Sequence, residues 1–340
     1  MYDEMVHDQE PGATADADAP DTTSGRAVAD AERAESADAA ASGSGHVGLE
    51  EAASGLERAS EGVPAPEWQA YPAADDGVHH TVVGTMKVMH GVASPELGNE
   101  RPLYVYLPPS YATDPERRFP VLYMHDGQNL FDVATSFGGE WEVDQTLESA
   151  SADGLEAIVV GIPNAGAERL DEYSPFVDER HQAGGRGDAY LDFVVGTVKP
   201  LIDRDFRTLP ERDSTGVAGS SMGGLITLYA FFRHPEVFGF AGIMSPALWF
   251  GQREIYDFVR DAAYVPGRIY VDVGTREGRE ELTDVRRLRD LLIEKGYRKG
   301  KDFLYVVEMG GTHSEAAWAR RLRKELQFLL GTPLATTALQ

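Results

Sequence analysis

The segment 219–224 reads Gly-Ser-Ser-Met-Gly-Gly and contains the pattern Gly-x-Ser-x-Gly, with Ser221 at its centre. A short apolar stretch, 215–218, precedes it, and an apolar, helix-forming stretch follows from Leu225. A serine on a sharp strand-to-helix turn needs small neighbours, and the free N–H groups of the helix start stabilise negative charge that develops beside it. Ser221 is the candidate nucleophile. Because the bare pattern is common in a glycine-rich chain, an incidental turn is the alternative.

A serine nucleophile needs a base, and among nine histidines His313 has the most suitable position. It lies in the glycine-flanked segment Gly-Gly-Thr-His-Ser-Glu, 310–315, after the last apolar strand-like stretch and before the last helix-like stretch. A histidine on such a loop can reach over the carboxyl edge of a sheet, where Ser221 would also emerge. The alternative is that His313 caps the final helix.

The third group is an acid that orients the imidazole, and the chain order serine, acid, histidine places it between the other two. Glu277 is the first carboxylate after the strand-like stretch 268–273, on a short loop that can reach the imidazole. Asp284 remains an alternative, although it lies further on, inside the expected helix 280–295.

Negative charge on a reacting carbonyl oxygen needs two backbone N–H donors. One is expected from Met222, directly after the nucleophile, and the other from the turn in Tyr-Met-His-Asp-Gly-Gln, 123–128. Gly127 allows that turn, so Gln128 is the second candidate donor. A glycine turn without a role is the alternative.

Aromatic residues in the two long insertions, and after the sixth expected strand, are candidates for lining a pocket for an acyl or aryl group. The candidates are Phe131, Trp141, Tyr173 and Trp249. Ordinary core packing is the alternative for each of them. No metal-ligand spacing such as His-Glu-x-x-His occurs, and Gly-Ser-Gly-His-Val-Gly at 43–48 lies in low-complexity sequence, so we expect no metal and no bound cofactor.

The elements that would position these side chains alternate along the chain. Two β-rich stretches come first and pair around a turn, and six short apolar stretches follow that do not alternate in polarity, as in parallel strands covered on both faces. The eight expected strands are 81–90, 101–109, 119–124, 155–162, 215–218, 238–244, 268–273 and 303–307. Helix-length segments separate them at 188–203, 225–233, 280–295 and 314–330. The pattern predicts an α/β fold, with a doubly wound, mostly parallel, eight-stranded sheet and helices on both faces.

The amino-acid composition limits the kinds of partner that the chain is expected to bind. The chain of 340 residues has 56 acidic and 31 basic side chains, a net charge of −25, which argues against nucleic acid as a partner. Residues 1–64 hold 15 of the acidic and 3 of the basic side chains in Ala-, Asp-, Glu-, Gly- and Ser-rich sequence. We therefore expect a disordered acidic tail at 1–66, one catalytic domain at 67–331 and a short tail at 332–340.

Other function classes are excluded by what the chain lacks. It contains no cysteine, which excludes disulfide scaffolds, thiolate metal sites and cysteine nucleophiles. The sequence has no long apolar run, and its first residues lack the basic and then apolar pattern of a signal peptide. We therefore expect no membrane association and a cytoplasmic location.

Five blocks occur together in this order, at 123–132, 139–144, 219–224, 273–277 and 310–318. Over residues 78–330 they resemble the esterase branch of the α/β-hydrolases, which includes enterochelin esterase-like and esterase D-like proteins, feruloyl esterases and mycolyltransferases. The resemblance implies the α/β-hydrolase fold, a small-molecule ester substrate and a serine esterase that works through an acyl-enzyme. It implies Ser221 as nucleophile, His313 as base and Glu277 as acid, with Gln128 and Met222 as oxyanion donors; many members have Asp where Glu277 stands.

Two other readings of the same residues stay open. An acyltransferase would use the same site if an acceptor alcohol outcompetes water. A binding protein without activity on this fold is the alternative from a different class.

Overall fold

The computed structural model describes residues 66–73 and 77–331. The tails expected at 1–66 and 332–340 lie outside the described residues, apart from Pro66. The catalytic domain expected at 67–331 stays a prediction, and residues 74–76 within it also lie outside the described residues.

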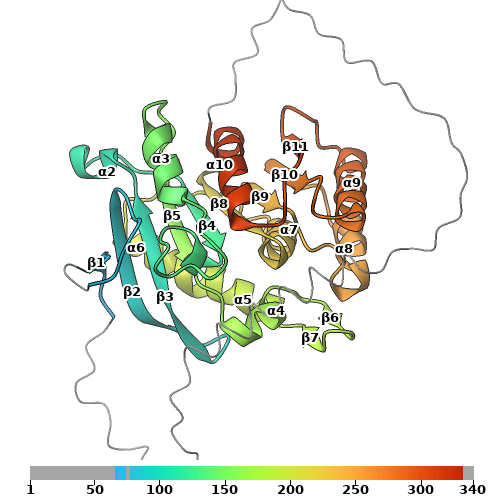
Figure 1. The fold of residues 1–340 in the computed structure, drawn as a ribbon, viewed down its shortest axis with the longest axis horizontal. Helices are drawn as coiled ribbons and strands as arrows, with labels where there is room; N and C mark the ends of the chain where they lie inside the picture. The colour runs from blue at the N-terminus through green and yellow to red at the C-terminus, as the bar shows by residue number, and fades with distance from the viewer. Residues whose placement is uncertain (1–65, 74–76, 332–340) are drawn as a thin grey trace, which may run out of the picture.

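Within this part, the central sheet has nine strands in the order β1-β2-β3-β5-β4-β8-β9-β10-β11 (Figure 1). Strands β5, β4, β8, β9, β10 and β11 run parallel, whereas β1, β2 and β3 form an antiparallel edge that joins β5. The strands of this sheet are β1 (Gln69–Tyr71), β2 (Thr85–Ser94), β3 (Asn99–Leu107), β4 (Val121–His125), β5 (Ile158–Ile162), β8 (Thr215–Ser220), β9 (Phe240–Met244), β10 (Arg268–Gly274) and β11 (Phe303–Glu308). The predicted α/β fold with a mostly parallel sheet is confirmed.

All eight expected strands are present, and the sheet has a ninth strand, β1, that the sequence pattern does not predict. It spans three residues and is mostly exposed, so it carries no hydrophobic pattern, and only its pairing with β2 across 69–71 and 86–88 makes it a strand. The first expected strand also begins later, at Thr85. The residues before it are held by side chains instead, with the Val83 N–H donating to Asp144 Oδ2 at 2.7 Å. A separate pair, β6 (Val177–Asp178) and β7 (Ala183–Gly184), forms a small hairpin.

The four expected helices are present, but the segment 188–203 is interrupted. It consists of α5 (Gly187–Asp192), a π-helical turn (Phe193–Val198) and α6 (Lys199–Asp205). The other helices are α2 (Ser110–Thr113), α3 (Val143–Ser151), α4 (Arg169–Glu172), α7 (Met222–Arg233), α8 (Ile255–Asp261), α9 (Arg279–Glu294) and α10 (Glu315–Leu330). Short 3₁₀ turns cover 127–129, 166–168, 212–214 and 251–253.

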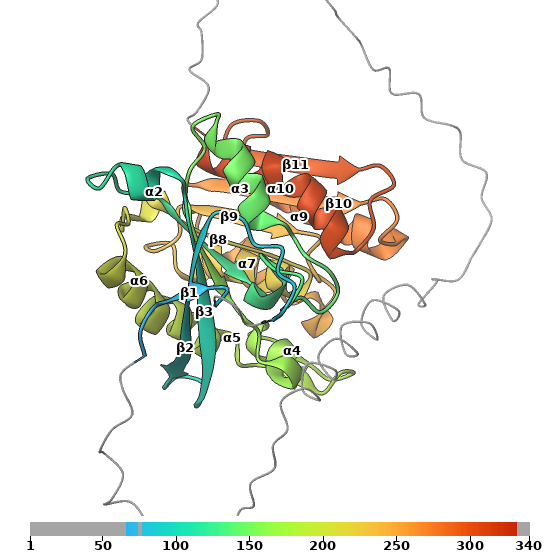
Figure 2. The ribbon, with the colours of Figure 1, turned by 60° about the vertical axis from the view of Figure 1, so that its left-hand side comes forward.

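Side chains alternate between the two faces of each strand, and each face has its own apolar core. One core packs Tyr123, Val217 and Ile243 of the strands against α5, α6, α7, α8 and α9. The other packs Leu122 and Met244 against α3 and α10, which lie side by side in Figure 2. Helices therefore cover both faces, and the loops at the carboxyl ends of the parallel strands share one edge.

Candidate active site

Ser221 lies at the turn between the end of β8 and the start of α7. Its backbone has φ 56° and ψ −121°, a strained conformation for a residue with a side chain. Glycine is required at 219, because a Cβ there would lie 2.9 Å from the Gly223 carbonyl carbon. Two backbone bonds hold the turn. Ser221 N–H donates to the carbonyl of Met244, the last residue of β9, at 3.1 Å, and the N–H of Ala247, in the segment after β9, donates to Ser221 O at 2.9 Å.

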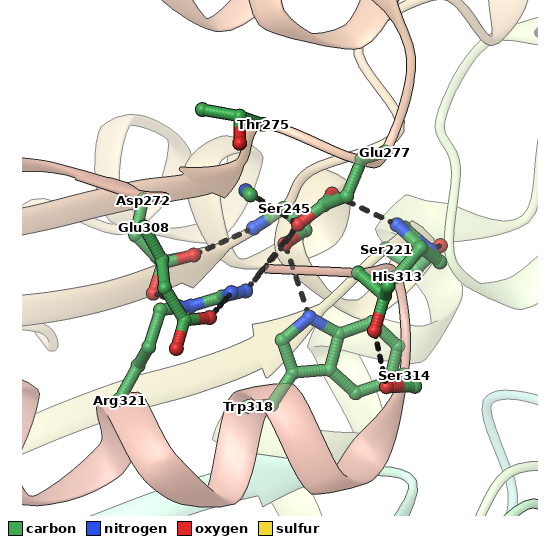
Figure 3. Close-up of polar contacts among 12 residues, drawn as sticks. Ser221, Ser245, Asp272, Thr275, Glu277, Glu308, His313, Ser314, Trp318 and Arg321 are labelled. Atoms are coloured by element: carbon green, nitrogen blue, oxygen red, sulfur yellow. Dashed lines mark hydrogen bonds and ion pairs between the residues drawn. The ribbon is translucent and has the colours of Figure 1, made fainter. Parts of the chain in front are cut away.

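The predicted nucleophile and base are in contact. Ser221 Oγ lies 2.7 Å from His313 Nε2, and His313 comes from the loop between β11 and α10 (Figure 3). The ring of Trp318, one turn into α10, meets the imidazole edge-on, with centroids 5.0 Å apart and planes at 82°. The indole therefore limits how far the imidazole can turn away from Ser221.

Glu277, on the loop after β10, contacts the other imidazole nitrogen, with its Oε2 3.1 Å from His313 Nδ1. Burial works against the charged carboxylate, but hydrogen bonds from His313 and Ser245 and the charge of Arg321 hold the pKa of Glu277 below its usual value. An ionised carboxylate only accepts, so Nδ1 carries a proton and Nε2 is left to accept from the Ser221 hydroxyl. This is the protonation state that a general base requires.

The alternative acid, Asp284, lies on α9 and faces a different partner. Arg253 Nε donates to its two carboxylate oxygens at 3.0 and 3.1 Å, and Arg253 also pairs with Glu280. The geometry brings Glu277, rather than Asp284, to the imidazole.

Strand order explains how three distant segments meet. Strands β8, β9, β10 and β11 are consecutive parallel neighbours, with Ser220 opposite Met244, and Gly274 opposite Glu308. Their carboxyl ends therefore lie along one edge, and the loops that carry Ser221, Glu277 and His313 begin there.

The two candidate oxyanion donors come from adjacent segments, because β4 pairs with β8. Met222 is the first residue of α7, and Gln128 lies in the 3₁₀ turn 127–129 after β4. Within the described residues, neither backbone N–H donates a hydrogen bond to a protein acceptor. Only glycine fits at 127, since a Cβ would lie 2.5 Å from the Gly161 carbonyl carbon of β5.

A buried ion pair holds the segment before Gln128. Asp126 has φ 54°, and its carboxylate accepts from Arg169 Nε at 2.9 Å and Nη2 at 3.0 Å. Asn164 Nδ2 donates to the same carboxylate at 2.7 Å. These three bonds tie the turn after β4 to the segment that follows β5.

The four predicted pocket aromatics have different surroundings. Phe131, Trp141 and Tyr173 are buried, at 2%, 3% and 0% exposure. Trp141 packs on Trp318 with centroids 5.5 Å apart, and Tyr173 Oη accepts from the Asp126 N–H at 3.0 Å. Trp249, on the segment after β9, is half-buried. Contact of these four residues with a substrate stays a prediction.

Sequence reasoning missed Ser245 and Arg321, which contact Glu277, and the pair of Asp126 with Arg169. Ser245 directly follows β9, so the rule used for Ser221 and Glu277, a polar residue just after a buried parallel strand, could have found it. Arg321 lies inside α10 among other arginines, and nothing in its spacing sets it apart.

The described residues contain neither a metal-binding cluster nor a membrane-spanning helix. In residues 66–73 and 77–331, no group of three or more His, Asp or Glu side chains is arranged to hold a metal ion. In the same ranges, no helix has the length and apolar content needed to cross a bilayer.

Comparison with known proteins gives a consistent result. The model of the Esterase family, described as "Putative esterase", matches residues 94–329. The uncharacterized protein YbbA of Bacillus subtilis is 30% identical over 264 residues, which cover 73% of this chain and 100% of YbbA. The siderophore triacetylfusarinine C esterase of Aspergillus fumigatus is 28% identical over 135 residues, 38% of this chain and 44% of that protein. The enterobactin esterase FES of Shigella flexneri has a TM-score of 0.57 at 20% identity, over 71% of this chain and 58% of that one.

The family match covers most of the described domain, and the structural likeness agrees with the α/β-hydrolase type of fold. The expected resemblance over residues 78–330 is thereby confirmed. The chain belongs to the Esterase family and is an esterase of the serine-hydrolase type that acts on carboxylic esters.

Proposed function

We propose that Ser221, His313 and Glu277 form the catalytic triad of this esterase and that hydrolysis proceeds through an acyl-enzyme on Ser221. The observation that carries the proposal is the continuous contact from Ser221 Oγ to His313 Nε2, 2.7 Å, and from His313 Nδ1 to Glu277 Oε2, 3.1 Å. Both distances suit hydrogen bonds that activate a serine.

In the first half of the reaction, Ser221 Oγ attacks the ester carbonyl carbon and its proton passes to His313 Nε2. The carbonyl oxygen becomes an oxyanion that accepts from the Gln128 and Met222 N–H groups. The intermediate collapses as the ester C–O bond breaks, and the leaving alcohol takes the proton from His313. Glu277 stays ionised and stabilises the imidazolium meanwhile.

In the second half, water attacks the acyl-enzyme while His313 accepts one of its protons. The second tetrahedral intermediate releases the acid, and Ser221 recovers its proton from His313. An acyltransferase would differ only here, with an acceptor alcohol in the place of water.

The substrate is proposed to be a small-molecule ester. Support comes from the names of relatives, which include siderophore triacetylfusarinine C esterase and endo-1,4-beta-xylanase/feruloyl esterase. Screening short acyl, feruloyl and catecholate esters would identify the acyl part.

The proposal is tested with Ser221→Ala, using 4-nitrophenyl acetate hydrolysis and fluorophosphonate labelling. We expect kcat to fall by about 10⁴-fold or more and labelling to disappear, because the nucleophile is lost. Ser220→Ala is the matched control, because Ser220 is the adjacent buried serine at the end of β8. Labelling that persists at the wild-type level in Ser221→Ala would overturn the assignment. A burst of nitrophenol that is followed by faster turnover with added alcohol would favour acyl transfer over hydrolysis.

A further inference from the structure

The two carboxylate oxygens of Glu277 have different surroundings. Oε2 faces His313, as described above. Oε1 accepts from the Gly274 N–H at 2.6 Å and from the Ser245 hydroxyl at 2.8 Å, and Arg321 Nη2 lies 3.5 Å away. Donors on one side therefore hold the carboxylate so that its other oxygen is directed at the imidazole (Figure 3).

The direction of the Ser245 O–H bond is determined by its neighbours. Ser245 is buried, and its Oγ receives the Trp318 Nε1–H at 3.0 Å and an Arg321 Nη2–H at 2.8 Å. An indole N–H and a guanidinium can only donate, so both acceptor positions of the hydroxyl are filled. The single Ser245 proton therefore has to be donated to Glu277.

Arg321 links this hydroxyl to two further strands. Its side chain is 4% exposed, and its three nitrogens donate to Asp272 of β10 at 2.8 Å, Glu308 of β11 at 2.7 Å and Ser245 at 2.8 Å. The planar fork of an arginine can serve three separate acceptors, whereas a lysine presents a single ammonium point. The guanidinium therefore bridges Asp272 of β10 and Glu308, the last residue of β11, and the loops after these two strands carry Glu277 and His313.

We propose that Ser245 and Arg321 are positioning residues for catalysis: Arg321 orients the Ser245 hydroxyl, and that hydroxyl holds the Glu277 carboxylate with Oε2 directed at His313. This inference rests on the proposed triad. Neither residue contacts the reacting atoms, so both act through Glu277.

The surrounding charges explain why the acid needs these donors. Arg321 of α10, and His313 when it is protonated, are the cations near Glu277; Asp272 of β10, Glu281 of α9 and Glu308 of β11 are the neighbouring acids. Burial raises the pKa of Asp272 to about 6, although Arg321 opposes this, and burial also raises the pKa of Glu281. A carboxylate among buried acids takes up a proton readily unless donors stabilise its charge.

Removal of the Ser245 hydroxyl is expected to change the pH dependence of kcat/KM. Loss of the Ser245 hydroxyl removes a donor from Glu277, so the pKa of Glu277 rises and the carboxylate also favours the imidazolium of His313 more strongly. The active form needs Glu277 ionised and His313 neutral, so the acidic limb of kcat/KM against pH moves to higher pH.

The first experiment compares Ser245→Ala with Ser94→Ala. Ser94 is also buried and its hydroxyl donates to a glutamate, Glu96, at 3.3 Å, but it lies on β2, far along the sheet from β10. For Ser245→Ala we expect kcat to fall about 10- to 100-fold, KM to stay nearly constant and the acidic limb to shift upward by about 0.5–1 pH unit. Ser94→Ala should leave the pH profile unchanged, because it removes the same chemical group at another place.

The second experiment uses Arg321→Lys, which retains the positive charge. A lysine cannot hold Asp272, Glu308 and Ser245 at once, so the acidic limb should shift in the same direction as in Ser245→Ala. Both changes act through one oxygen of Glu277. The fold-decrease in kcat of the double variant should therefore be smaller than the product of the fold-decreases of the two single variants. If Arg321→Lys fails to fold, the Ser245 series and the low-field NMR signal of the His313 Nδ1 proton, expected to move in Ser245→Ala, still test the inference.

The inference is overturned if Ser245→Ala has the wild-type kcat and acidic limb, or if it loses only thermal stability, with an unchanged pH profile. That outcome would leave the proposed triad intact. The triad itself fails instead if Ser221→Ala remains active, so the two failures are distinguishable.

Discussion

Asp126 and Arg169 form a buried ion pair with two hydrogen bonds, 2.9 and 3.0 Å long, directly before the turn that carries the Gln128 amide. The pair joins the segment after β4 to α4, which lies beyond β5 in the chain. Burial works against the charge of Asp126, but the guanidinium of Arg169 and the amide of Asn164 hold its pKa below the usual value. The position of one proposed oxyanion donor therefore depends on a tertiary ion pair.

Asp126→Asn is expected to lower both stability and kcat. Asn tolerates the left-handed backbone at 126, but it removes the carboxylate that accepts two hydrogen bonds from the buried Arg169 guanidinium, which costs about 3–5 kcal/mol. We expect a lower Tm and a lower kcat in steady-state assays, because the Gln128 amide loses its support.

Asp188→Asn is the control for this variant, because its pair with Arg233 is exposed and should contribute about 1 kcal/mol or less. The contribution of Asp126 to the free energy of unfolding depends on pH. The pKa of Asp126 is lowered in the folded state, so its contribution is present above the unfolded value and is lost as pH falls through the folded one. Equal Tm losses in the two variants would contradict the role given to the buried pair.

Glu277→Gln should reduce kcat by about 10²- to 10⁴-fold with KM nearly unchanged, because the carboxylate stabilises the imidazolium that forms in the transition state. Asp284→Asn should keep kcat close to that of the wild type and lower Tm modestly, since Asp284 pairs with Arg253 rather than His313. Steady-state kinetics and thermal unfolding of both variants separate the two roles. An inactive Asp284→Asn beside an active Glu277→Gln would mean that the acid is misassigned.

Glu325→Met should stabilise the protein at neutral and alkaline pH. Glu325 of α10 is fully buried, and neither carboxylate oxygen has a hydrogen-bond partner among the described residues. Burial and the neighbouring Asp272 raise its pKa well above the usual value. When the pKa of a group is higher in the folded state, the free energy of unfolding decreases as pH rises above the pKa of that group in the unfolded state. Glu325 therefore destabilises the wild type at neutral pH.

Thermal scans of Glu325→Met check this prediction. We expect a Tm gain of about 2–4 °C or more at pH 8 that becomes smaller toward pH 4, while exposed Glu294→Met changes Tm little at either pH. A loss of Tm at pH 8 would show that Glu325 is held by favourable contacts.

Trp249→Ala should change the relative kcat/KM values for short and bulky acyl esters, because Trp249 is half-buried on the segment after β9, whose Ala247 N–H bonds Ser221 O. Phe131→Leu, at another of the predicted pocket residues, should in addition lower Tm. Phe131 is buried and its ring packs against Gly161 of β5, so its loss costs core packing, about 1–3 kcal/mol. An unchanged ratio in Trp249→Ala would contradict the pocket role predicted for Trp249.

Features that depend on neighbours along the chain could be predicted from the amino-acid sequence. The strand, the Gly-x-Ser-x-Gly turn and the helix around Ser221 follow from local composition, and so do the eight principal strands. Glu277 and His313 could be selected because each follows a buried strand, and the ends of parallel strands share an edge. Family membership followed from the order of such local blocks.

The partners of these residues depend on how distant elements pack, and no local pattern predicts them. In the folded chain, Asp284 accepts hydrogen bonds from Arg253, Asp126 pairs with Arg169, and Ser245 accepts from Arg321. Residues 69–71 form a strand by pairing with β2, and a π-helical turn interrupts the helix expected at 188–203. Periodicity and turn residues specify elements, whereas these contacts depend on the register and packing of elements far apart in the chain. A hydrogen bond between two such side chains leaves no pattern in either segment.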